Sequence, residues 1–67
     1  MILSDSDKIF INENIANADE IINSDDVDLV LSKISEVMMM EGFDANDEIN
    51  DFGRLAEKVY DNIFYNN

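Results

Sequence analysis

The segment that follows Asp44 contains residues that could bind a calcium ion, at part of the EF-hand spacing. Asp44, Asn46 and Glu48 occupy the first, third and fifth loop positions, where oxygen ligands are needed. The pattern then fails, because the sixth position is Ile49 in place of glycine and the twelfth is Leu55 in place of a bidentate glutamate. We therefore predict no metal site, and a helix-capping role explains Asp44 more simply.

Ser24 invites comparison with a cofactor attachment site. Acyl and peptidyl carrier proteins are also small, acidic and helical, and they carry phosphopantetheine on the serine of an Asp-Ser-Leu type motif that opens a helix. Ser24 stands instead in the order Asn-Ser-Asp-Asp. Capping of the following helix accounts for this serine, and we predict no cofactor.

The side chains that most often catalyse reactions near neutral pH are missing. The chain has no histidine and no cysteine, which removes the usual general base, the thiolate nucleophile and the commonest transition-metal ligand. Carboxylates, serines, lysines and tyrosines remain, but no glycine-rich loop or nucleophile elbow positions them. We predict a non-catalytic protein.

The net charge is the most informative property of the composition. Sixteen Asp and Glu residues against four Lys and Arg give a formal charge of −12 at pH 7. Nucleic acid and anionic membranes carry the same sign of charge and are disfavoured as direct partners, whereas a basic protein is favoured. The N-terminus has no basic region followed by a long apolar segment, so we expect no signal peptide or membrane span, and a cytoplasmic location.

Three stretches, at residues 7–23, 25–41 and 45–64, have the periodicity of amphipathic helices, and they must position any functional side chain. Apolar residues recur in them at steps of three and four, which places these residues on one helix face. The expected core positions are Ile11, Ile15, Ala18 and Ile22, then Val27, Val30, Leu31, Ile34, Val37 and Met38, and finally Ile49, Phe52, Ala56, Val59 and Ile63. The sequence predicts one all-α domain over residues 1–67, a compact three-helix bundle, with a dimer as an open possibility because so short a chain buries a small core.

Capping residues and glycines suggest where these helices begin and end. Ser4 or Ser6 could cap the first helix, and Ser24 the second. Gly42 is expected to end the second helix in the left-handed conformation. Gly53 lies inside the third, where it either permits a close approach of another helix or splits the element, and we favour one continuous helix.

The acidic surface is the main candidate for function. Duplex DNA carries one negative charge per about 1.7 Å of axis, and a helix rises about 1.5 Å per residue, so carboxylates on adjacent helices can approach the charge density of a phosphate backbone. The predicted partner-binding residues are Asp25, Asp26, Asp28, Glu36, Glu41, Asp44, Asp47, Glu48 and Asp51. The leading hypothesis is a nucleic-acid mimic that inhibits a basic, nucleic-acid-handling protein, by analogy with small acidic inhibitors encoded by phages that act against host or defence enzymes.

The alternative hypothesis is a helical interaction or assembly module, and it rests on apolar residues outside the predicted core stripe. Leu29, Met39 and Met40 lie partly off this stripe. Methionine can fill irregular space inside a small core, or it can contact another chain. In the second case these three residues would mediate self-association as a homodimer or docking on a partner helix, and the negative charge would serve solubility.

Overall fold

Four α-helices make up the fold in the computed structural model, which describes residues 1–67. In chain order they are α1 (Asp5–Asn14), α2 (Ala18–Asn23), α3 (Val27–Glu41) and α4 (Asp51–Asn66). The all-α prediction is confirmed. The predicted count of three helices is wrong, because the expected helix at 7–23 is divided into α1 and α2.

The break between α1 and α2 comes from the local chemistry of asparagine. Asn17 adopts the left-handed conformation, with φ of 59°, so a right-handed helix cannot continue through it. Just before the break, the Asn14 side-chain amide donates to the carbonyl oxygen of Phe10 at 3.0 Å, competing with the backbone ladder. The apolar spacing of three and four continues across the break, which is why the sequence pattern suggested one helix.

Helix α3 begins two residues later than expected, and its cap is Asp26 and not Ser24. The Asp26 carboxylate accepts a hydrogen bond from the backbone N–H of Leu29 at 3.2 Å. The Ser24 hydroxyl donates to the carbonyl of Ile21 and accepts from the N–H of Asp26, so it closes the α2–α3 turn. Asp25, between the two, has a positive φ of 55°.

Helix α4 begins at Asp51, six residues after the predicted start, and its cap is Asn50 and not Asp44. The Asn50 side-chain oxygen accepts from the N–H of Gly53 at 2.7 Å, and its amide donates to the carbonyl of Glu41 at 2.9 Å. Asn50 therefore caps α4 and fastens it to the end of α3. The intervening loop contains one antiparallel bridge, between Phe43 and Ile49.

The two glycines lie against each other where the end of α3 meets the first turn of α4. Gly42 ends α3 with φ of −86°, so the predicted left-handed conformation is wrong. A Cβ atom on Gly42 would lie 3.0 Å from the Cα of Gly53, and one on Gly53 would overlap the Gly42 carbonyl oxygen. Both residues must therefore be small, and Gly53 permits a close approach within one uninterrupted helix, as predicted.

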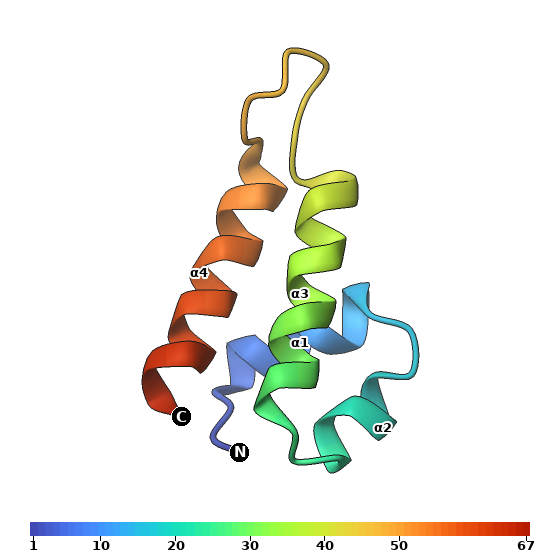
Figure 1. Ribbon diagram of the computed structural model, residues 1–67, viewed down its shortest axis with the longest axis vertical. Helices are drawn as coiled ribbons and strands as arrows, with labels where there is room; N and C mark the ends of the chain where they lie inside the picture. The colour runs from blue at the N-terminus through green and yellow to red at the C-terminus, as the bar shows by residue number, and fades with distance from the viewer.

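Helices α3 and α4 run side by side and antiparallel, and α1 and α2 lie across one side of this pair (Figure 1). One apolar core lies between these layers. Its buried residues are Phe10, Ile11, Ile15, Ala18, Ile21, Val30, Leu31, Ile34, Ala56, Val59 and Ile63. Ile21 takes the buried position expected for Ile22, since α2 begins anew after the break.

The chain ends meet at the pole opposite the α3–α4 loop (Figure 1). The Asn67 side chain accepts from the N–H of Ile2 at 2.6 Å and donates to its carbonyl at 2.9 Å. The amino group of Met1 forms an ion pair with Asp25. None of the four helices combines the length and apolar composition that crossing a bilayer requires.

Candidate functional site

All nine acidic residues predicted to bind a partner are solvent-exposed, but they do not form one continuous patch. Asp25, Asp26 and Asp28, the N-terminal acidic cluster, lie where α3 begins. A second group, the loop acidic cluster, lies at the opposite pole around the α3–α4 loop: Glu41, Asp44, Asp47, Glu48 and Asp51. Glu36 lies between them on α3, a helix about 22 Å long.

Few of these carboxylates have a cationic partner within the protein. The structure contains two ion pairs, one between the Met1 amino group and Asp25 and one between Lys33 and Glu36 at 3.5 Å. The Lys33–Glu36 pair is exposed and contributes at most about 1 kcal/mol. Most of the negative charge is therefore free to interact with another molecule.

Asp26 and Asp44 also hold the backbone in place. Asp26 caps α3, and the Asp44 carboxylate accepts from the backbone N–H groups of Asn46 and Glu48, at 2.8 and 3.1 Å. The EF-hand spacing thus corresponds to a turn held by one aspartate. No group of three acidic side chains has an arrangement suited to a metal ion.

Asp26→Ala is expected to lower the free energy of unfolding by about 1 kcal/mol, because the first turn of α3 loses its cap. Asp26→Asn keeps a capping oxygen and is expected to change stability by less than about 0.5 kcal/mol. Urea denaturation followed by circular dichroism measures both. Equal losses in the two variants would show that the carboxylate charge, and not the cap, is what stabilises α3.

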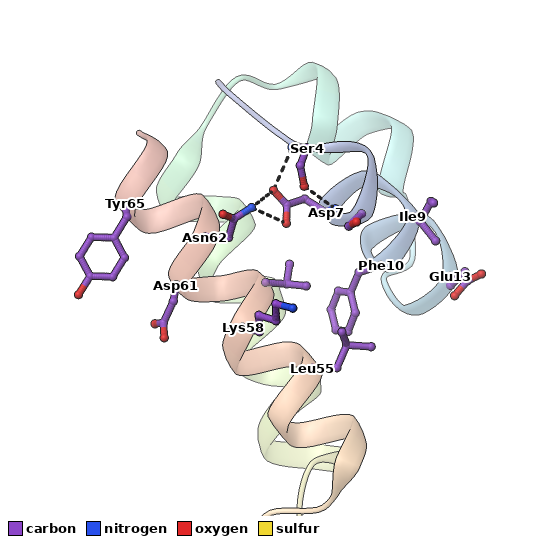
Figure 2. Close-up of a pocket in the computed structure, with 12 residues that line it drawn as sticks. Ser4, Asp7, Ile9, Phe10, Glu13, Leu55, Lys58, Asp61, Asn62 and Tyr65 are labelled. Atoms are coloured by element: carbon purple, nitrogen blue, oxygen red, sulfur yellow. Dashed lines mark hydrogen bonds between the residues drawn. The ribbon is translucent and has the colours of Figure 1, made fainter.

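The largest concave feature is a groove of about 590 Å³ between α1 and α4 (Figure 2). Ile9 and Leu55 contribute exposed apolar side chains to its walls, and the buried Phe10 ring lies beside Leu55. Lys58 extends from α4 toward α1, whereas Tyr65 and Asp61 point away (Figure 2). The groove is therefore lined by both apolar and polar residues, and Lys58 is its single cation.

One end of this α1–α4 groove is closed by Asp7, the only buried charged residue, which is 3% exposed. Its two oxygens accept from the Asn62 amide at 2.9 and 3.2 Å, and one of them also accepts from the N–H of Ser4. The Ser4 hydroxyl in turn accepts from the N–H of Asp7, which completes a capping box. Because its hydrogen bonds are satisfied within the protein, Asp7 fastens α1 to α4.

A second groove, of about 530 Å³, lies between α3 and α4 and brings together residues from both hypotheses. Asp28 and Glu36, predicted for partner binding, line it together with Met39, predicted for self-association. Tyr60 and Phe64 of α4 form the other wall. This α3–α4 groove combines acidic and apolar side chains and contains no basic residue.

The three predicted self-association residues do not form one patch. Leu29 is 36% exposed and lines a separate depression beside the α1–α2 connection. Met40 is 83% exposed and lines neither groove beside α4, whereas Met39, at 72%, lies in the α3–α4 groove. The structure thus places Met39 beside Asp28 and Glu36 in the α3–α4 groove, and Leu29 in the other depression with Glu36.

Sequence reasoning missed both grooves beside α4 and the Asp7–Asn62 contact. The Ser4-x-x-Asp7 spacing is a capping-box pattern that could have located the start of α1 at Asp5. Nothing in the sequence pairs Asp7 with Asn62, which are 55 positions apart. The residues that line the grooves lie at the edges of the apolar stripes on their helices. Whether two such edges meet depends on the angle at which the helices pack.

No family model, curated protein sequence or solved structure matches this chain.

Proposed function

We propose that this protein is a non-catalytic inhibitor that binds a basic, nucleic-acid-handling protein through its acidic surface. The observation that carries the proposal is the excess of exposed, unpaired carboxylates. Of sixteen acidic residues only Asp7 is buried, and only two carboxylates form ion pairs. Uncompensated charge of one sign attracts an oppositely charged cleft and raises the association rate.

The dimensions of the molecule also favour a nucleic-acid mimic. It measures 36 Å along its longest axis and 23 by 19 Å across, and one turn of B-DNA is about 34–36 Å long. A duplex of that length carries about 21 phosphate charges, against a net charge of −12 on this protein. At about half the charge of DNA in a body of similar length, this protein could compete for a basic cleft.

A helical assembly module remains the second candidate, because large apolar side chains are exposed outside the core. Met39, Met40 and Tyr65 are each more than 70% exposed. Patches of such residues often mark interfaces. This candidate predicts association that resists salt, whereas the inhibitor predicts association that salt weakens.

The test is affinity capture of partners from a bacterial lysate at low salt and at about 0.5 M salt, where the Debye length falls to a few ångströms. A retained nucleic-acid enzyme that is released by salt and by competing DNA, and whose activity falls on addition of this protein, is the expected result. Recovery of this protein alone, or of an apolar partner at both salt concentrations, would contradict the inhibitor and favour the assembly module.

Three variants with the same loss of three charges locate the binding surface. Asp25→Asn/Asp26→Asn/Asp28→Asn neutralises the N-terminal acidic cluster and retains the Asp26 cap, and Glu41→Gln/Glu48→Gln/Asp51→Asn neutralises the loop acidic cluster. The matched control on α1 and α2 is Asp5→Asn/Glu13→Gln/Asp19→Asn. We expect at least one cluster variant to weaken the captured complex about tenfold or more and to flatten its salt dependence. Equal weakening by all three would indicate that only net charge matters.

A further inference from the structure

The α3–α4 groove differs from the rest of the acidic surface because carboxylates and exposed apolar side chains lie together in it. Met39 is 72% exposed and Phe64 is 56% exposed, on opposite walls. The Phe64 ring also packs edge-on against Tyr65, with ring centroids 5.4 Å apart. Exposed methionine and phenylalanine in a groove are typical of surfaces that receive an apolar side chain from a partner.

The charge along this groove is entirely negative. Asp28 and Glu36 line it on α3, eight positions and so about 12 Å apart. On α4, Glu57 is exposed and lies three positions before Tyr60 of the groove wall, on the same side of the helix. Carboxylates on both helices therefore flank the apolar strip, which consists of Leu31, Met39, Tyr60 and Phe64.

The basic residues of the two helices face elsewhere. Lys33 lines the depression that contains Leu29, Lys58 lines the α1–α4 groove (Figure 2), and Arg54 of α4 lines neither. None of the three lines the α3–α4 groove, although Lys33 pairs with Glu36 at its edge. An occupant of this groove would thus meet apolar surface in the middle and carboxylates at both sides, of which only Glu36 has a cationic partner.

We propose that the α3–α4 groove docks a basic amphipathic helix of the partner protein. A helix that bears apolar residues at i, i+3, i+4 and i+7, with Lys or Arg on the flanking positions, matches both the apolar strip and the carboxylates beside it. This inference rests on the proposed function, since it names the element of the basic partner that is bound. In this arrangement the α3–α4 groove supplies the affinity, and the two acidic clusters attract the partner at long range.

The probe is a synthetic helical peptide of leucine and lysine, about 18 residues long, with leucines on one face. A peptide of identical composition with scrambled order has the same charge without an apolar face. Nuclear magnetic resonance of methionine methyl and aromatic signals locates the binding site, and fluorescence anisotropy gives the affinity. We expect the amphipathic peptide to shift the signals of Met39, Tyr60 and Phe64 and to bind about tenfold more tightly than the scrambled one.

Variants separate the groove from the acidic surface as a whole. Met39→Gln/Phe64→Ser is expected to weaken the amphipathic peptide about tenfold, and Asp28→Asn/Glu36→Gln is expected to weaken it and reduce its salt dependence. The control, Leu29→Gln/Met40→Gln, changes two exposed apolar residues of α3 that lie outside the groove, and it should leave the affinity unchanged. Loss of affinity in the control as large as in the groove variant would overturn the proposal.

Other outcomes overturn the groove while leaving the proposed function standing. Equal affinity for the two peptides, or shifts confined to the acidic clusters or the α1–α4 groove, would mean that the α3–α4 groove is not the docking site. Shifts of the Met39 methyl signal with protein concentration alone would assign the groove to a second copy of the chain. The proposed function fails on a different result, the absence of any basic partner in the lysate.

Discussion

Gly53→Ala is expected to lower the free energy of unfolding by about 2 kcal/mol, although alanine is the better helix former. In an open helix this substitution would gain about 1 kcal/mol. Here the new Cβ atom would overlap the Gly42 carbonyl oxygen and lie 2.7 Å from the Cγ1 atom of Ile49. The Gly42 oxygen also accepts from the N–H of Asn50 at 2.8 Å. It therefore cannot shift without breaking this hydrogen bond, which closes the α3–α4 loop.

Equilibrium denaturation in urea measures this change, and the size of the chain makes it large. A chain of 67 residues has a total stability of about 3–10 kcal/mol. The matched control is Glu57→Ala, at an exposed position of the same helix, where a change within about 0.5 kcal/mol is expected. A Gly53→Ala protein more stable than the wild type would mean that α3 and α4 are not in contact at these glycines.

Asp7→Ala is the second substitution with a large expected effect, a loss of about 2–3 kcal/mol. It removes the acceptor of three hydrogen bonds and half of the capping box of α1. The N–H of Ser4 and the amide of Asn62 would then lack partners in a partly buried site. We expect α1 to detach more readily from α4, which is visible as faster hydrogen exchange in α1.

A double-mutant cycle separates the two roles of Asp7. Asn62→Ala alone is expected to cost about 1 kcal/mol, and Asp7→Ala/Asn62→Ala to cost less than the sum of the single losses, with a coupling of about 1 kcal/mol. Thermal or urea unfolding of the four proteins gives the coupling. If the losses add without coupling, Asp7 acts only as a helix cap and does not fasten α1 to α4.

Periodicity in the sequence predicted the helical class and most of the core, because buried residues recur at steps of three and four whatever the connections are. Val30, Ile34, Val59 and Ile63 are buried as expected. The same pattern could not reveal the break at Asn17, since Ile15 and Ala18 on either side of it are three positions apart, as in a continuous helix.

Several residues near each expected helix start are good caps, and the sequence alone does not show which of them the structure uses. Asp44 and Asn50 are both good caps, and the structure uses Asn50 because its side chain also reaches the carbonyl of Glu41 at the end of α3. The exposure of the predicted acidic residues could be anticipated from their type. Their division between two poles follows from the length of α3 and the antiparallel course of α4.

The hydrogen bonds between Ile2 and Asn67 hold the two chain ends together, so the backbone almost forms a closed ring. A short linker could join the two ends in place, and the α3–α4 loop could be opened to make new ends, because its residues 43–48 are all exposed. The chain would then begin with α4 and end with α3 while every helix kept its neighbours. A label or tether attached at the present ends would lie at the pole away from the loop acidic cluster, leaving that cluster accessible.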